Sequence, residues 1–192
     1  DRHDPLTDAY RTVRNLVLFV QENSAPGSRG HITLVVSPSP GDGKTALAVN
    51  LAAAMAESGR RTVLVHSDFR RPRMIPALGP DAQHPPAVLL EDVQSLGPRS
   101  LLSRSGRSNL RVFDLSSVDG TAVELVRATT AKLDELAEAS DHIVIDTSPV
   151  GATAEVLELV PYADTIVLVS RVGHTKIAPA QRAVTILRDL TE

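Results

Sequence analysis

The sequence predicts an α/β fold, a three-layer sandwich in which helices cover both faces of a mostly parallel central sheet. The first observation is the order of its segments, because short apolar runs alternate with stretches whose apolar residues recur at helical spacing. The second is composition: of 192 residues, 42% are hydrophobic and only 3% are aromatic, so Val, Leu, Ile and Ala must build the core. The third is length, which suits a single domain spanning residues 1–192.

Five short apolar runs are the predicted strands. Each is rich in aliphatic residues, many of them β-branched, and is bounded by turn or helical segments. They cover residues 31–36, 62–65, 110–113, 142–145 and 165–169. Strands that alternate with helices pair in parallel through right-handed crossovers, and such sheets bind ligands at the carboxyl ends of their strands. Residues that follow these runs are therefore the first candidates for chemistry.

Helical segments lie between and around the strands. The first covers residues 6–21, with Thr7 or Asp8 as a plausible cap. Further helices are predicted at 46–57, 121–139, 154–160 and 177–190. Residues 72–109 are rich in proline, glycine and serine, so we expect a mobile, loop-rich segment there, with one short helical patch near 87–96.

Composition and charge exclude several classes of function. The net charge is −3 without a block of lysine and arginine, so nucleic acid is not expected as a partner. Cysteine is absent, which excludes disulfides and thiol catalysis, and the six scattered histidines lack the spacing of a zinc site. No apolar run reaches the roughly 20 residues of a membrane span, and no signal peptide opens the chain. Because the first residue is Asp1, we expect a piece of a longer protein.

A glycine-bearing loop joins the first predicted strand to the next helix and indicates a nucleotide site. Residues 37–45 read Ser-Pro-Ser-Pro-Gly-Asp-Gly-Lys-Thr. In such loops the backbone N–H groups and the helix N-terminus bind phosphates, the lysine adds a positive charge and the threonine hydroxyl ligates Mg²⁺. We therefore expect ATP or ADP on a P-loop NTPase-like fold. The expected contacting residues are Ser39, Pro40, Gly41, Asp42, Gly43, Lys44, Thr45 and Ala46.

Carboxylates follow two of the strands at the same predicted edge. Mg²⁺ prefers hard oxygen ligands, commonly a loop hydroxyl with one or two carboxylates, so Asp146 is expected to join Thr45 at the ion. Asp68 follows the second strand and lies at the same edge. For Asp146 alone, a helix cap or turn residue is an equally good interpretation. For the loop, the alternative is an ordinary turn with a surface lysine, since Pro38 stands where the strict pattern has glycine.

Four ordered motifs carry a resemblance to a known family. They are Asp8-Ala-Tyr-Arg-Thr-Val-Arg14, Ser39-Pro-Gly-Asp-Gly-Lys-Thr45, Val63-Leu-Val-His-Ser-Asp-Phe-Arg-Arg-Pro72 and Ile143-Val-Ile-Asp-Thr-Ser-Pro-Val150. These motifs resemble the bacterial tyrosine kinases, or BY-kinases. Shorter matches near 162–175 extend the resemblance over nearly the whole chain, whereas residues 76–125 match weakly. The resemblance implies a P-loop domain that binds Mg-ATP, autophosphorylates tyrosines and takes part in capsular or exopolysaccharide biosynthesis and export.

Residue roles follow from the resemblance by matching position. Lys44 would hold the β- and γ-phosphates and stabilise charge during transfer. Asp68 matches the second acid of the family's Asp-x-Asp motif and would serve the metal together with Thr45 and Asp146. The first acid of that motif, thought to help deprotonate the substrate tyrosine, is His66 here. A neutral imidazole can accept a proton, so His66 is either a working base or a histidine tolerated at a strand end.

The N-terminal segment, residues 1–30, is expected to form an interface helix and a turn. Asp8, Arg11 and Arg14 resemble the family's Glu-x-x-Arg-x-x-Arg segment, which docks on the neighbouring subunit of a ring. The alternative is a solvated helix face. The resemblance further implies a membrane-embedded polysaccharide chain-length or export protein as partner, in cis or in trans, and a location at the cytoplasmic face of the bacterial inner membrane.

Further departures from the family bear on activity. The family's tyrosine cluster follows the last helix, but the only tyrosines here are Tyr10 and Tyr162, and neither has the setting of a flexible phosphoacceptor. If the domain is active, its phosphoacceptors lie outside this chain. The family's Pro-Asn-Pro segment is replaced by residues 118–122.

Two other functions remain open on the sequence. One is a pseudokinase, a scaffold that binds ATP or ADP and assembles without phosphorylating anything, which His66 motivates. The other is an ATPase of the MinD/ParA type. Those proteins carry a signature lysine early in the loop, where this chain has Ser39, so this alternative is the weaker one.

Overall fold

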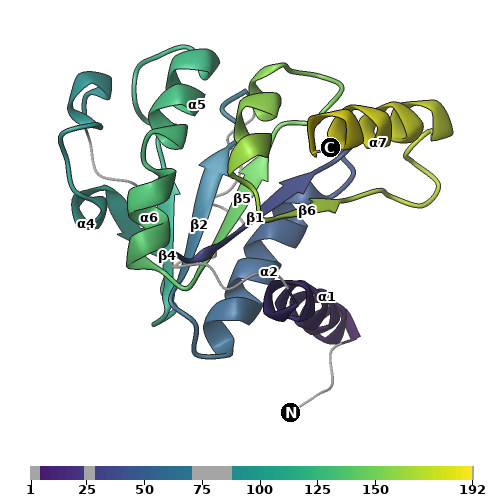
Figure 1. Ribbon diagram of the computed structural model, residues 1–192, viewed down its shortest axis with the longest axis horizontal. Coiled ribbons are helices and arrows are strands. Elements are labelled where there is room, and N and C mark those ends of the chain that lie inside the picture. The colour runs from purple at the N-terminus through teal and green to yellow at the C-terminus, as the bar shows by residue number, and fades with distance from the viewer. Residues whose placement is uncertain (1–4, 24–28, 71–87, 192) are drawn as a thin grey trace.

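The computed structural model describes residues 5–23, 29–70 and 88–191, and it confirms the predicted α/β fold (Figure 1). Its strands are β1 (His31–Val36), β2 (Thr62–Ser67), β3 (Leu102–Arg104), β4 (Leu110–Asp114), β5 (His142–Thr147) and β6 (Thr165–Leu168). They form one six-stranded sheet in the order β3-β4-β2-β5-β1-β6. The pairs are parallel except β3 with β4, which is antiparallel.

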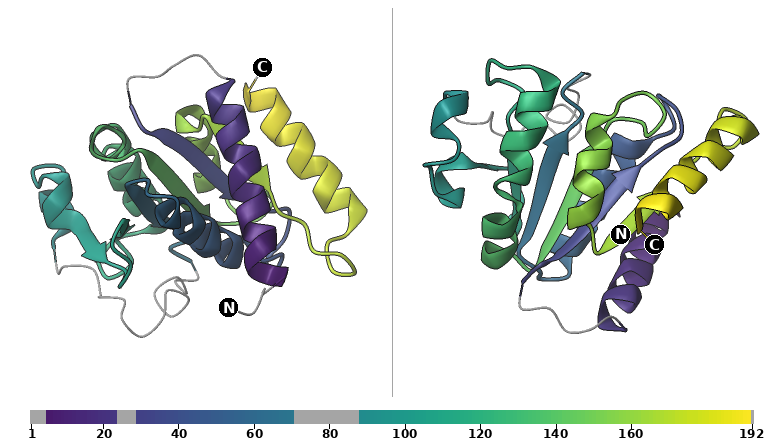
Figure 2. Two further views of the ribbon diagram at one scale, coloured as in Figure 1. Left: turned by 90° about the horizontal axis from the view of Figure 1, so that it is seen from below. Right: turned by 45° about the horizontal axis from the view of Figure 1, so that its top comes forward.

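Helices cover both faces of this sheet (Figure 2). On one face lie α1 (Pro5–Glu22) and α2 (Lys44–Glu57). On the other lie α5 (Ala122–Thr130), α6 (Leu133–Ala139), α7 (Ile177–Thr191) and the 3₁₀ helix η2 (Glu155–Tyr162). The short helices η1 (Leu90–Asp92) and α4 (Pro98–Leu101) precede β3 at the sheet's far edge.

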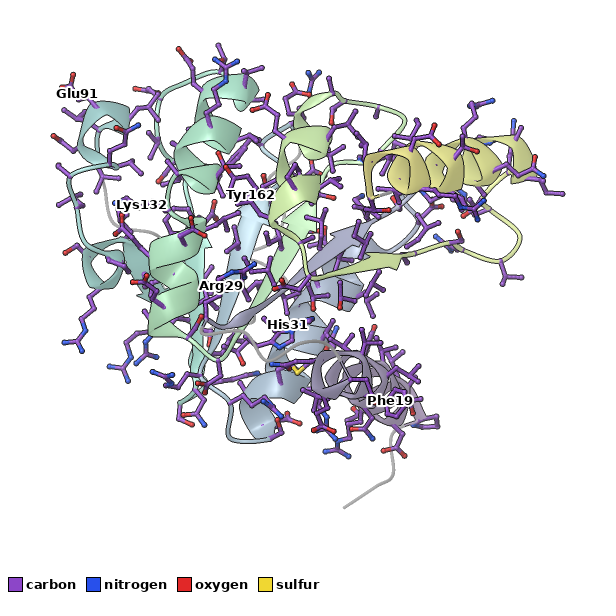
Figure 3. The ribbon with its side chains drawn as sticks, viewed as in Figure 1. Phe19, Arg29, His31, Glu91, Lys132 and Tyr162 are labelled. Atoms are coloured by element: carbon purple, nitrogen blue, oxygen red, sulfur yellow. The ribbon has the colours of Figure 1, made fainter. Side chains whose placement is uncertain are left out.

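The core consists of two aliphatic layers, one on each side of the sheet, because successive strand residues point to opposite faces. In β5, Ile143 and Ile145 belong to the layer that also contains residues of α5 and α6, whereas Val144 belongs to the layer that contains residues of α2. Tyr162 is half-buried at the end of η2 and packs against the layer that contains Ile143 and Ile145 (Figure 3). Aliphatic side chains therefore form most of both core layers, so the sheet is buried although few residues of the chain are aromatic.

The structure corrects three predicted elements. The strand β3 was not expected, because three residues are too few to show alternation. The predicted helix 121–139 is two helices, α5 and α6, separated at Ala131 and Lys132. The break places the buried Lys132 amine 2.8 Å from the carbonyl oxygen of Gln94. The predicted helix 154–160 is a 3₁₀ helix that extends to Tyr162.

The segment expected to be loop-rich, 72–109, is only partly covered. Residues 72–87 lie outside the described residues, and the remainder contains η1, α4 and β3. Within the ranges that the structure describes, none of the helices combines the length and the apolar character that a membrane crossing requires.

Candidate functional site

The predicted phosphate loop lies between β1 and α2, at the carboxyl end of the sheet. Gly41 and Gly43 adopt φ values of 85° and 101°, a left-handed conformation that favours glycine. The helix α2 starts at Lys44, so the first N–H groups of α2, which have no partner within the helix, lie next to the loop. This is the local geometry that suits phosphate binding.

Asp42 holds the loop in shape from the inside. Its side chain is fully buried, and its Oδ2 atom accepts a hydrogen bond of 2.8 Å from the backbone N–H of Ser39. Its Oδ1 atom accepts one of 2.6 Å from the hydroxyl of Thr175, which follows β6. The ring of His174 adds a contact of 3.2 Å between its Nε2 and the carbonyl oxygen of Pro40. A distant turn therefore supports the loop.

A cavity of about 470 Å³ opens above the loop. Its walls come from the loop and the start of α2, from the end of β2 and from the segment after β5. The lining residues are Pro40, Gly41, Gly43, Lys44, Thr45, Ala46, Asp68, Arg70, Ser148, Pro149, Ala152 and Thr153. Lys44 is 5% exposed, and no described residue accepts a hydrogen bond from its amine. An ammonium group at the wall of a cavity, without an acceptor among the described residues, favours an anionic ligand.

Below the cavity, three ionisable side chains form a row across neighbouring strands. His66 of β2 is in register with Asp114 of β4 on one side and with Asp146 of β5 on the other. All three are buried, with exposed fractions of 1%, 3% and 0% in that order. The row lies on the face covered by α2, because Leu64 and Val144, two residues earlier on β2 and β5, pack against that helix.

Within this row, the contact between His66 and Asp146 is not a hydrogen bond. The His66 Nδ1 atom is 3.8 Å from the Asp146 Oδ2 atom. Neither ring nitrogen of His66 and neither carboxylate oxygen of Asp146 has a hydrogen-bond partner among the described residues. Burial lowers the pKa of His66, but the carboxylates of Asp146, Asp114 and Asp68 outweigh it, so the pKa lies above its ordinary value.

Asp68 and Asp146 are both placed at the carboxyl edge, as predicted, but in different environments. Asp68 lines the cavity and accepts a hydrogen bond of 3.0 Å from the hydroxyl of Ser148. Asp146 lies deeper and is fully buried, and apart from the 3.8 Å contact with His66 its oxygens accept no hydrogen bond from a described residue. In the described ranges no three His, Asp or Glu side chains are placed to hold a metal ion by themselves. Mg²⁺ commonly takes one or two carboxylates and completes its shell with phosphate and water, so the residues fit that ion together with a nucleotide.

An ion pair closes one side of the cavity. Arg70 reaches from the end of β2 to Glu155 at the start of η2, with 2.7 Å between its guanidinium nitrogen and the Oε1 atom. The hydrogen bond from Arg70 lowers the pKa of Glu155. Of the two cations that line the cavity, Arg70 has a carboxylate partner, whereas the amine of Lys44 has no acceptor among the described residues.

The predicted interface residues lie away from this cavity. Asp8, Arg11 and Arg14 share one side of α1, as their spacing requires. Within this chain, Arg11 is 3.4 Å from Asp8 and 3.8 Å from Glu57 of α2, and Arg14 donates a hydrogen bond of 3.3 Å to the carbonyl oxygen of Ala54. The two arginines therefore also fasten α1 to α2.

Most of the residues predicted for the nucleotide site are brought together. Pro40, Gly41, Gly43, Lys44, Thr45, Ala46 and Asp68 line one cavity, whereas Ser39 and Asp42 shape the loop and His66 and Asp146 lie below it. Sequence reasoning missed Ser148, Arg70 and Asp114. The first two stand two residues after Asp146 and Asp68, a spacing that could have drawn attention to them. Asp114 is found only through the register of β4.

Comparison with curated proteins places the chain beside tyrosine-protein kinases. It is 24% identical over 176 residues to the tyrosine-protein kinase ptk of Acinetobacter johnsonii, covering 91% of this chain and 23% of that protein. It is 27% identical over 179 residues to the tyrosine-protein kinase YwqD of Bacillus subtilis, covering 92% and 73%. The chain thus spans about a quarter of the first relative and about three quarters of the second. No family model matches the chain.

Solved structures share the fold at low sequence identity. The chimerical protein CapA2B2 superposes with a TM-score of 0.82 at 20% identity, covering 98% of this chain and 81% of that one. The kinase domain of the Escherichia coli tyrosine kinase ETK gives 0.76 at 20% identity, covering 96% and 71%. The MinC:MinD complex of Aquifex aeolicus gives 0.64 at 22% identity, covering 84% and 64%.

Proposed function

Because the chain belongs to the bacterial tyrosine kinase (BY-kinase) domain family, we propose that it binds Mg-ATP and transfers the γ-phosphoryl group to tyrosine. The observation that carries this proposal is the cavity beside the phosphate loop, which is lined by Asp68 and by Lys44, whose amine has no acceptor among the described residues. Family membership implies nucleotide binding, and the cavity offers the positive charge and the N–H donors that phosphates need.

In this proposal the chain contributes position and charge. The loop N–H groups and the start of α2 orient the β- and γ-phosphates, and Lys44 stabilises the charge that builds up on them. The tyrosine oxygen bonds to the γ-phosphorus as the bond to the β–γ bridging oxygen breaks and ADP leaves. Asp68 accepts the tyrosine proton, because it lines the cavity whereas the ring of His66 is 1% exposed.

Thr45, Asp68 and Asp146 are the residues that would hold Mg²⁺. When bound, the ion would neutralise phosphate charge during transfer. The two oxygens of the buried Asp146 support this assignment, because they accept no hydrogen bond from a described residue, and a carboxylate without donors in the interior is costly unless a cation comes to it.

The wider setting is proposed from the relatives. The chain is 25% identical over 183 residues to the succinoglycan biosynthesis transport protein ExoP of Rhizobium meliloti, covering 89% of this chain and 22% of that protein. We propose a role in capsular or exopolysaccharide synthesis, beside a membrane-embedded chain-length or export protein at the cytoplasmic face of the membrane. Asp8, Arg11 and Arg14 are the proposed contacts to the next subunit of a ring.

A second candidate function is a scaffold that binds a nucleotide but transfers no phosphoryl group. The observation that favours it is His66, a ring that lies 3.8 Å from the buried Asp146 carboxylate where the resembling family has an acid. In this case the cavity would still bind ATP and the chain would still assemble. Changing His66 to aspartate would then create an activity that the unmodified chain lacks.

The deciding experiment measures nucleotide binding and phosphoryl transfer on the same sample. The chain of residues 1–192 is incubated with labelled Mg-ATP and a tyrosine peptide, while ATP affinity is measured by calorimetry. Transfer that requires Mg²⁺ supports the kinase. Binding without transfer, together with transfer by the His66→Asp variant, supports the scaffold. Absence of ATP binding overturns both.

A further inference from the structure

The turn that follows β6, residues 171–175, is held in shape by its own hydrogen bonds and reaches the phosphate loop. The carbonyl oxygen of Arg171 accepts hydrogen bonds of 3.0 and 2.9 Å from the N–H groups of His174 and Thr175. The hydroxyl of Thr175 in turn accepts one of 2.7 Å from the N–H of Arg171. Gly173 adopts a φ value of 74°, a conformation that favours glycine. The last two residues of the turn are therefore presented to the loop in a fixed geometry.

His174 and Thr175 act on different parts of the loop. Thr175 donates to the buried carboxylate of Asp42, whereas the Nε2 atom of His174 lies 3.2 Å from the carbonyl oxygen of Pro40. A carbonyl oxygen can only accept a hydrogen bond, so Nε2 carries the hydrogen in this contact. The Asp42 Oδ1 atom, 4.0 Å from the same nitrogen, favours that tautomer because its negative charge attracts the N–H group. His174 thus donates to the backbone of the loop itself.

The hydrogen bond from His174 also sets the direction of the next N–H group. The peptide between Pro40 and Gly41 is trans and planar, so its C=O and N–H groups point in opposite directions. Because the C=O is turned toward His174, the N–H of Gly41 points away from the ring. Glycine would allow this peptide to turn over, since it tolerates either sign of φ. The ring also packs closely, because its Nε2 atom is 3.3 Å from where a Cβ of Gly41 would stand. His174 therefore selects one of two accessible orientations of the peptide.

We propose that His174 is a positioning residue for the nucleotide: by holding the Pro40 carbonyl, it keeps the N–H of Gly41 directed at the phosphates. Pro40 and Gly41 line the cavity, whereas His174 is not among the described residues of its wall. No described residue accepts a hydrogen bond from the N–H of Gly41, so this donor is free for a ligand. The direction away from the ring is thus the direction in which a phosphate would lie. This role requires a nucleotide in the cavity and therefore rests on the proposed function.

Calorimetry of the chain of residues 1–192 with Mg-ADP tests this role. His174→Leu removes the donor and should weaken ADP binding by roughly tenfold, as expected when one hydrogen bond to a charged group is lost. His174→Gln retains an N–H donor of similar reach and should recover most of the affinity. Val172→Ala is the matched control, because that side chain belongs to the same turn and is fully exposed. It should bind ADP as the unmodified chain does.

Nuclear magnetic resonance gives a second readout at Gly41 itself. The amide proton of Gly41 should shift downfield when Mg-ADP binds to the unmodified chain. This shift should shrink in His174→Leu, although urea unfolding without ligand stays unchanged. Equal affinity, or an equal Gly41 shift, in His174→Leu would overturn the role of His174 and leave nucleotide binding intact. Equal weakening in His174→Leu and His174→Gln would also overturn it, because the packing of the ring and not its hydrogen bond would then matter. Absence of ADP binding to the unmodified chain would overturn the proposed function as well.

Discussion

The two ends of the sheet bury histidine in opposite surroundings. At the amino end, His142 begins β5 on the face covered by α2, and its Nε2 lies 3.0 Å from the Thr33 hydroxyl. The neighbouring His31 makes a matching contact of 2.8 Å with Thr165 (Figure 3 labels His31). At the carboxyl end, four residues further along the same face, Asp146 and its neighbour His66 have no such partners among the described residues.

The difference teaches that neighbours, and not burial alone, set the charge of an interior histidine. Burial lowers the pKa of His142, and the nearby His31 and Arg60 lower it further, to about 3. Burial acts on His66 in the same direction, but the surrounding carboxylates reverse it. The amino end therefore keeps a buried histidine neutral, whereas the carboxyl end places a buried histidine among three carboxylates.

The largest expected effect concerns acid stability at the amino end. Because the folded pKa of His142 is about 3 and the unfolded one is near 6.5, the unfolded chain binds a proton in this window that the folded chain excludes. The contribution of His142 to the free energy of unfolding is fully present above about pH 6.5. It falls by several kcal/mol as the pH drops toward 3. Urea unfolding of the unmodified chain and of His142→Asn across this range measures it, and the variant should show the flatter profile.

The control for this experiment is His174→Asn, which replaces an exposed histidine. The side chain of His174 is 48% exposed, so this variant removes a histidine and leaves the buried His142 in place. Equal slopes for the unmodified chain and His142→Asn would contradict the assignment.

The next effect concerns Lys44 at the carboxyl end. Lys44→Met should lower phosphoryl transfer by about 10²- to 10³-fold, as loss of one preorganised electrostatic contact does, and should weaken ATP binding. Folding should be preserved or improved, since the amine has no described acceptor. Lys132→Met is the matched control, because that buried amine bonds to Gln94 and Glu135. It should destabilise the chain and leave ATP affinity unchanged.

The smallest effect concerns Asp146 without ligand. Asp146→Asn removes a buried charge that has no hydrogen-bond donor among the described residues, so metal-free stability should rise by about 1–2 kcal/mol while metal-dependent nucleotide binding weakens. Urea unfolding with and without Mg·ADP measures both. Asp141→Asn, which loses contacts to Arg61 at the amino end, should instead lower stability slightly. A fall for Asp146→Asn would mean that its contact with His66 stabilises the fold.

Much of this could be predicted from sequence, because aliphatic runs and glycine positions are local signals. The strands β1, β2, β4, β5 and β6 and the loop at 37–45 follow from them. The break before α6 could not be predicted, since no glycine or proline marks it and it goes with a tertiary contact, that of Lys132 with Gln94. The row of Asp114, His66 and Asp146 depends on strand register, which no single segment reveals.

The support that Thr175 gives to Asp42 has a consequence for folding. The loop 37–45 is local in the sequence, yet it acquires its final shape through a contact that spans 133 residues. Closing such a distance is slow, because the chain between must first be ordered. We therefore expect the phosphate loop to mature late, after β6 has joined the sheet. A nascent chain that already contains the whole motif would not yet have its working form.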